Sequence, residues 1–315
     1  MRYLLVDVGA SYIKKLIYDD IMDYHEDVEI EVSPFRNMDT LEKKDLINIL
    51  KRIVEEAKQI DRIVFCTILG GGWVGNTYHS WKSNDINTKH HCLISGVFSD
   101  HPLYHLHSHH NGDELGLRPM GEINKIPVYS SLGDTPCLIE SLDIKEDEYV
   151  INMGTGSQVI SKIKENINTI SFLPAGRSFL VFDRFFGSMG VDFFMELKRI
   201  NSTEVYESTL EIDLNVFSKA RNFIDGGMIS RITENNFTLS NVMSSILRCF
   251  VLQYSEHLED PLKNTIKLVG GIPYKLPIIE DLFRHYHPTK KIINLSNSIP
   301  HTHIGIIKLI KRHLL

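Results

Sequence analysis

The sequence has few cysteines, no long apolar run and no excess of positive charge. None of the four cysteines among its 315 residues forms a CxxC pair, which argues against a disulfide framework or a structural zinc site. No apolar stretch approaches the ~18 residues that cross a bilayer, and the run after Met1 is too short for a signal sequence. The formal net charge of −6 argues against a nucleic-acid-binding surface. We therefore expect a cytoplasmic protein that acts on a small molecule, with no nucleic-acid or membrane partner and an unknown oligomeric state.

The length and the composition predict two globular domains. A chain that is 43% hydrophobic and 23% charged buries ordinary cores, and its length suits two domains better than one. Residues 6–11 and 151–157 share one pattern, in which a strand enters a polar residue, a glycine turn and a second strand. We place the domains at 1–144 and 145–315.

An acidic residue precedes the first glycine turn. Residues 3–18 predict two strands joined at Gly9, Ala10 and Ser11, with Asp7 at the end of the first strand. A carboxylate beside such a turn can hold a hydrated magnesium ion while the turn amides face phosphate. An ordinary hairpin with a turn-stabilising aspartate is the alternative.

A second acid stands where a strand meets a helix. The apolar run 126–129 stops at Gly133, and a helical segment follows from Pro136, so Asp134 either caps that helix or acts in catalysis. Downstream, the strand 149–152 enters a segment whose small residues leave backbone N–H groups open to an anion. That segment consists of Gly154, Thr155, Gly156 and Ser157.

Three further stretches have residue types that occur at ligand sites. Trp73 follows three glycines and either stacks on a sugar face or is a partly buried loop aromatic. The histidine-rich region 79–110 favours a polar loop over a metal site, because spacing alone does not establish convergent ligands. Gly270 and Gly271 end the strand 265–269 just before a helix, where a nucleotide's adenosine can lie against the backbone.

Between these stretches, residues 179–182 predict a strand and 185–200 a helix.

Together these segments resemble the FGGY carbohydrate kinases of the actin-like ATPase superfamily. Asp7-Val-Gly-Ala-Ser11 with Lys14 is similar to that family's first phosphate segment, and residues 152–157 to its second. Residues 126–134 resemble the segment that ends in the catalytic base, and residues 268–272 the adenosine segment. The order and spacing of the four segments are more specific than any one of them. The chain differs in being short, in having Ala10 where threonine is usual, and in lacking the family's sugar-reading patterns over residues 68–114.

The resemblance implies an α/β fold of two ribonuclease-H-like (actin-like ATPase) domains around a nucleotide cleft. It implies ATP and Mg²⁺ as cofactors and a sugar, ketose or polyol as substrate. Asp134 would be the catalytic base and contact the substrate, and Asp7 would hold the metal through water. The glycine segments with Lys14 would bind the nucleotide. The alternatives are a nucleotide-binding regulatory protein and a filament-forming assembly protein of the same fold, neither with kinase activity.

Overall fold

The chain divides into two compact units. The computed structural model describes residues 1–9, 11–67, 71–80, 93–99, 117–154, 156–164, 167–173, 175–214 and 227–315. The N-terminal unit comprises Met1–Asp143 with Ile299–Leu315, and the C-terminal unit comprises Ile144–Ser298. Residues 299–315, which the sequence interpretation assigned to the second domain, therefore pack within the N-terminal unit.

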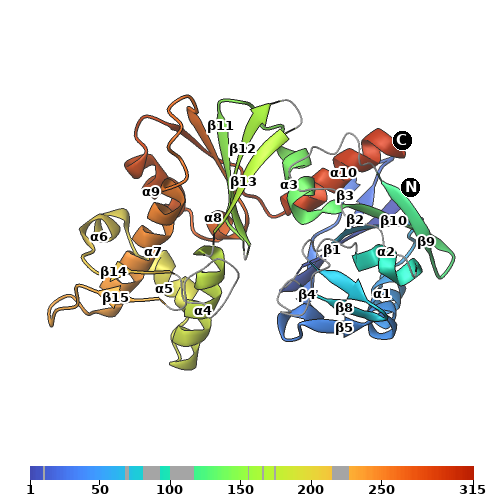
Figure 1. The fold of residues 1–315 in the computed structure, drawn as a ribbon, viewed down its shortest axis with the longest axis horizontal. Coiled ribbons are helices and arrows are strands. Elements are labelled where there is room, and N and C mark those ends of the chain that lie inside the picture. Colours follow the sequence, from blue (N-terminus) through green and yellow to red (C-terminus); the bar gives the residue numbers. More distant parts are fainter. Residues whose placement is uncertain are drawn as a thin grey trace. The chain divides into compact units, whose positions relative to one another are not determined.

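The N-terminal unit contains a seven-stranded sheet (Figure 1). Its order is β3-β2-β1-β6-β10-β9, with β4 also paired to β2. The strands are β1 (Arg2–Val8), β2 (Tyr12–Asp19), β3 (Tyr24–His25), β4 (Glu29–Val32), β6 (Arg62–Thr67), β9 (Arg118–Ile123) and β10 (Ile126–Gly133). Strands β1, β6 and β10 are parallel to one another, whereas β2 and β9 run antiparallel to their neighbours. A small sheet has the order β5 (Thr40–Glu42), β8 (Thr77–His79), β7 (Gly72–Val74).

Helices cover both faces of the seven-stranded sheet. They are α1 (Lys43–Glu56), α2 (Leu93–Phe98), α3 (Asp134–Leu142) and α10 (His301–His313), with a 3₁₀ turn at Pro34–Arg36. Alternate residues of β1 enter two cores: Leu4 and Val6 pack in the cluster that includes α1 and α2, and Tyr3 and Leu5 in the cluster that includes α10. A parallel strand that is buried on both faces reads as a continuous apolar run, which is why β1 was recognisable from sequence.

Helices α3 and α10 lie side by side within the N-terminal unit (Figure 1). A β-carbon on Gly305 of α10 would lie 1.9 Å from the carbonyl oxygen of Cys137 in α3. Only glycine permits this approach. Two polar contacts extend the pairing: Ser141 Oγ lies 3.0 Å from His301 Nδ1, and Lys308 Nζ donates to the Ser141 carbonyl at 2.9 Å.

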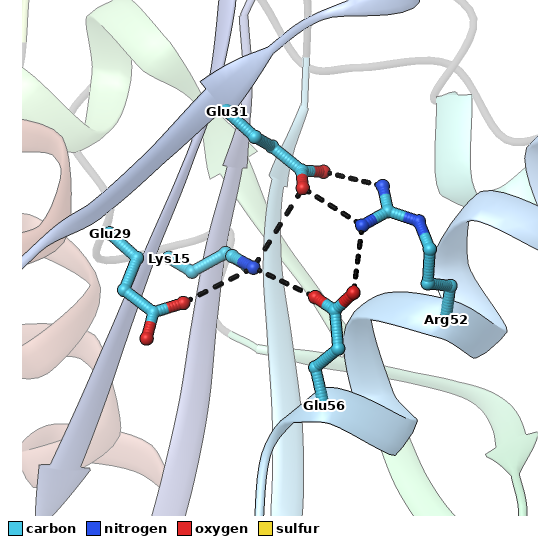
Figure 2. A network of polar contacts seen from close by, with 5 residues as sticks. All are labelled: Lys15, Glu29, Glu31, Arg52 and Glu56. Atoms are coloured by element: carbon cyan, nitrogen blue, oxygen red, sulfur yellow. Dashed lines mark hydrogen bonds and ion pairs between the residues drawn. The ribbon is translucent and has the colours of Figure 1, made fainter.

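A charged network fastens strand β4 to helix α1, as Figure 2 shows. The largely buried ammonium of Lys15 in β2 lies 3.2 Å from both Glu29 and Glu56 and 3.8 Å from Glu31. Arg52 of α1 binds Glu31 at 2.9 Å and Glu56 at 3.0 Å. Because Lys15 meets three carboxylates, the network ties three separate elements together at one point.

The C-terminal unit has a five-stranded sheet of order β13-β12-β11-β16-β17. These strands are β11 (Glu148–Asn152), β12 (Ser157–Lys164), β13 (Ile167–Leu173), β16 (Thr265–Val269) and β17 (Lys291–Asn294). Strands β11, β16 and β17 are parallel, and β12 and β13 form antiparallel hairpins beside β11. A two-stranded sheet pairs β14 (Glu211–Ile212) with β15 (Ile229–Ser230).

Six helices accompany this sheet in the described part of the unit. They are α4 (Ala175–Ser188), α5 (Phe193–Arg199), α6 (Ser202–Glu207), α7 (Leu239–Ser255), α8 (Gly271–Lys275) and α9 (Ile278–Tyr286). The strand predicted at 179–182 is wrong, because those residues belong to α4. Phe179, Phe182 and Phe186 follow helical spacing and bury one face of the helix. Among the described residues of both units, no helix is long and apolar enough to cross a membrane.

Candidate functional site

In the N-terminal unit, three parallel strands end at one edge of the sheet and bring two aspartates together. Asp7 pairs with Cys66 at the end of β6, and Gly133 at the end of β10 pairs with Thr67. Asp134 follows Gly133 directly, so it lies at the same edge as Asp7. Open α/β sheets bind their ligands at the carboxyl ends of parallel strands.

The Asp7 carboxylate is held by two partners. Asp7 is only 3% exposed. Its Oδ2 accepts hydrogen bonds from Lys14 Nζ at 3.1 Å and from Thr302 Oγ1 at 3.3 Å. Lys14 stands opposite Asp7 in the β1–β2 ladder. The charge of Asp7 outweighs desolvation and raises the pKa of Lys14, so the pair is a charged one. The sequence resemblance implied that Lys14 binds the nucleotide, whereas in the structure its ammonium binds Asp7.

The turn after β1 requires glycine at position 9. The Gly9 N–H donates to the Tyr12 carbonyl at 3.0 Å, and a β-carbon on Gly9 would lie 2.8 Å from that same oxygen. The Ser11 carbonyl accepts from the Ser33 N–H at 3.1 Å, which fixes the far side of the turn. Ala10 lies outside the described residues.

Asp134 is not the cap of helix α3. The capping position belongs to Gly133, and Asp134 Oδ1 accepts from the adjacent Thr135 N–H at 2.8 Å. Its side chain is exposed. Desolvation, followed by the charge of Asp7, raises the pKa of Asp134 against the opposing effects of Thr135 and Lys14. Because the side chain keeps contact with solvent, the rise is tempered by screening. The arrangement leaves a carboxylate that reaches solvent and binds a proton more readily than an ordinary aspartate.

His303 is a buried neighbour of Asp7 that sequence analysis missed. It is fully buried in the first turn of α10, and neither ring nitrogen makes a hydrogen bond of standard geometry to a described residue. Burial lowers its pKa to about 4, although Asp7 and weaker interactions with the backbone of Lys14 and Leu5 act in the opposite direction. The ring is therefore neutral near pH 7 and packs without adding a positive charge beside Lys14.

In the C-terminal unit, the two glycine segments lie next to each other at the carboxyl edge of the sheet. Strands β11 and β16 are parallel neighbours in which Asn152 pairs with Val269. Beyond them, the Met153 N–H donates to the Val269 carbonyl at 2.8 Å, and the Ile272 N–H donates to the Met153 carbonyl at 3.2 Å. Gly154 therefore lies close to the Gly270–Gly271 pair, and these glycines form one backbone surface at this edge.

The glycines of this surface have different reasons for being glycine. Gly270 has φ +104°, and a β-carbon there would lie 2.6 Å from the Met153 carbonyl oxygen, so the turn excludes other residues. A β-carbon on Gly154 or Gly271 would meet no described heavy atom within 4 Å. Gly156 and Gly271 are exposed. The backbone at these three positions is therefore open to a ligand.

Ser157 is a buried residue that holds this backbone surface in place through hydrogen bonds. It is 1% exposed, and its Oγ donates to the Gly154 carbonyl at 3.1 Å. The same oxygen accepts from the Gly176 N–H at 3.0 Å and from the Tyr254 hydroxyl at 2.7 Å. The sequence pattern placed Ser157 among the nucleotide contacts and gave no sign of Gly176 or Tyr254. In the structure the Ser157 hydroxyl makes its hydrogen bonds to other groups of the protein.

Trp73 is a core residue. It is 7% exposed and packs edge to face with Tyr78 at a centroid distance of 5.4 Å. A β-carbon on Gly96 would lie 2.0 Å from its indole nitrogen. This packing corrects the expectation that Trp73 stacks on a sugar. Thr155 and most of the histidine-rich region lie outside the described residues, and the described part of the chain contains no cluster of three side chains able to hold a metal ion.

The residues around Asp7 fit a hydrated magnesium ion. Magnesium prefers oxygen ligands, keeps several waters and is commonly bound through one or two carboxylates together with substrate phosphates. Asp7 Oδ2 is occupied by Lys14 and Thr302, whereas Oδ1 accepts no hydrogen bond from the described residues. A single open carboxylate oxygen suits a contact made through metal-bound water.

Comparison with known proteins identifies the fold. No protein-family model and no curated protein matches the sequence. A xylulose kinase from Lactobacillus acidophilus superposes with TM-score 0.65 at 9% identity, covering 98% of this chain and 89% of that one. A gluconate kinase from the same organism gives 0.64 at 10% identity, covering 99% and 89%. Ethanolamine utilization protein EutJ from Carboxydothermus hydrogenoformans gives 0.51 at 13% identity, covering 98% and 90%.

These similarities define the class of protein at the level of fold. The predicted α/β, actin-like ATPase fold is confirmed, as is the resemblance of this chain to sugar kinases in structure. Identities of this size show a shared architecture and leave the reaction to be argued from the site itself.

Proposed function

We propose that the protein is an ATP-dependent kinase that phosphorylates a hydroxyl group of a sugar, ketose or polyol. The observation that carries the proposal is the position of Asp134: an exposed carboxylate at the carboxyl edge of the sheet, beside Asp7, that is not used as the helix cap. A carboxylate with a raised pKa is a better proton acceptor than an ordinary aspartate. The sugar kinases that share the fold support this reading.

Asp134 would act on the acceptor hydroxyl. Phosphoryl transfer asks the protein mainly to position the triphosphate and the nucleophile and to stabilise charge. Asp134 would accept the hydroxyl proton at one of its carboxylate oxygens as the acceptor oxygen forms its bond to the γ-phosphorus. Its Oδ1 already binds the Thr135 N–H, which leaves Oδ2 for the substrate.

The remaining residues would bind the nucleotide and its metal. In the N-terminal unit, Asp7 would hold Mg²⁺ through water, and the turn of Gly9, Ala10 and Ser11 would offer backbone groups to phosphate. In the C-terminal unit, Gly154, Thr155 and Gly156 would contact phosphate, and Gly270 and Gly271 would border the adenosine. Bound Mg²⁺ would neutralise charge that develops on the phosphates. We accordingly propose that each unit is one ATPase domain.

The test is an ADP-release assay across a panel of ketoses, aldoses and polyols. We expect one acceptor, or a small group of them, to stimulate ADP release well above the acceptor-free rate, with a phosphorylated product that mass spectrometry detects. The Asp134→Asn variant should lose the stimulation and still bind ATP. ADP release that no acceptor stimulates would refute the kinase assignment.

A nucleotide-binding regulatory or assembly protein without kinase activity is the second candidate. Two observations favour it: EutJ shares the fold, and Trp73, the aromatic predicted to contact a sugar, is buried in the core. The same assay separates the candidates, because a regulatory or assembly protein binds ATP without acceptor stimulation. Light scattering with and without ATP would detect filament formation.

A further inference from the structure

The two oxygens of the Asp7 carboxylate have different surroundings. Oδ2 accepts from Lys14 and from Thr302. Oδ1 accepts no hydrogen bond from the described residues. The carboxylate is held through Oδ2, and Oδ1 has no hydrogen-bond partner among the described residues.

Thr302 reaches Asp7 from the far end of the chain. It lies 295 residues away in sequence, in the first turn of the 13-residue helix α10, where the chain has just returned to the N-terminal unit at Ile299. The Thr302 hydroxyl therefore joins the start of α10 to the Asp7 carboxylate.

Helix α10 is rigidly placed where Thr302 needs it. Gly305 lets the helix lie directly against the backbone of Cys137, and His303, which follows Thr302 in the chain, is fully buried. At 3.3 Å the Thr302 contact is longer than the usual 2.5–3.0 Å for a hydroxyl and an oxygen acceptor. Catalytic hydrogen bonds are often long in the free protein and shorten when the ligand binds.

We propose that Thr302 is a positioning residue that holds Asp7 with Oδ1 directed at the hydrated magnesium ion of the nucleotide. The inference rests on the proposed function and deepens it by adding a residue of α10 to the metal site. Residues that hydrogen-bond to a metal's carboxylate fix its orientation, and their loss commonly lowers metal affinity 10- to 100-fold. For an ion bound through water, we expect the effect to lie at the lower end of this range.

The test measures how strongly magnesium tightens nucleotide binding. Isothermal titration calorimetry with the non-hydrolysable β,γ-imido analogue of ATP gives one Kd with Mg²⁺ and one with excess EDTA. In Thr302→Val, which keeps the shape and removes the hydroxyl, the Mg²⁺-dependent gain in affinity should fall about 10-fold. The metal-free Kd should stay within about 2-fold, and Thr302→Ser should restore the gain.

Ser141→Ala is the matched control. It removes a hydroxyl that contacts His301 at the same α3–α10 interface without touching Asp7, so its Mg²⁺-dependent gain should equal that of the wild type. An equal loss in Ser141→Ala, or a Thr302→Val variant that weakens both Kd values alike, would overturn the inference and assign Thr302 a packing role. A wild-type protein that binds the analogue under neither condition would instead refute the proposed function.

Discussion

Replacing Asp134 with asparagine tests the proposed chemistry most directly. Asparagine keeps an oxygen to accept the Thr135 N–H, which Asp134 Oδ1 binds at 2.8 Å, and it loses the ability to take a proton. The start of α3 should therefore be preserved, since the capping residue is Gly133. A positioned general base typically contributes a factor of about 10²–10⁴ to the rate. We expect kcat to fall by this amount, with the affinity for ATP unchanged within about 2-fold.

The same substitution has an expected effect on stability. Desolvation and Asp7 raise the pKa of Asp134 in the folded state, so ionisation of Asp134 lowers the free energy of unfolding. This destabilisation is absent below the unfolded pKa of ~3.9 and fully present above the folded pKa. Asparagine carries no charge at any pH. The variant should therefore be at least as stable as the wild type near pH 7, and the difference should disappear as the pH falls through this window.

The assay combines acceptor-stimulated ADP release with thermal unfolding at several pH values. Asp45→Asn is the control, because Asp45 is an exposed aspartate in the first turn of α1 in the same unit and lies outside the proposed site. It should leave turnover unchanged. Lower activity together with higher or equal stability identifies Asp134 as the base. Undiminished turnover in Asp134→Asn would refute that role, and a clear loss of stability at pH 7 would point to a structural one.

Three further predictions concern the framework of the site. Gly270→Ala should lower the unfolding free energy by about 1–3 kcal/mol and weaken nucleotide binding, because φ is +104° and Met153 blocks a β-carbon; Gly271→Ala should stay within about 0.5 kcal/mol in the same denaturant titration. Tyr254→Phe should cost about 1 kcal/mol in urea unfolding, because it removes the buried hydroxyl that donates to Ser157 at 2.7 Å; an unchanged midpoint would contradict that role. Hydrogen bonds, first from Arg52 and then from Lys15, lower the pKa of Glu56. The ionised Glu56 therefore stabilises the fold above the unfolded pKa, and this stabilisation is lost as the pH falls through the folded pKa. In acid-unfolding curves, Glu56→Gln should be less stable than the wild type near pH 7 and equally stable at low pH.

The parts of the site that follow from local sequence were predictable. A buried strand that ends in an acid and a glycine turn placed Asp7 correctly at the end of β1, and Gly133 marked the junction of β10 and α3. These features depend on residues within a few positions of one another. Strand alternation and turn chemistry read such neighbours directly.

Contacts between distant segments were not predictable from one sequence. Ser157 binds Tyr254 across 97 positions, and Asp7 binds Thr302 across 295. Nothing in the local pattern of either partner indicates the other. The aromatic run of α4 misled for a different reason: phenylalanine has strand propensity, but burial of one helical face against the core overrode it. The sequence left two interpretations of Trp73 open, because its close neighbour Gly96 in α2 lies in another segment.

In both units, buried side chains hold the groups that we propose to contact the ligand. In the C-terminal unit the open glycine positions rest on the buried hydroxyl of Ser157, which binds Gly176 and Tyr254. In the N-terminal unit the open oxygen of Asp7 is backed by Lys14 and Thr302. Sites reach the required geometry only when their supporting residues are themselves fixed. Removing a supporting hydroxyl should therefore change the free energy of ligand binding more than it changes the free energy of unfolding. This difference distinguishes a site that is preorganised for its ligand from one that forms only when the ligand binds.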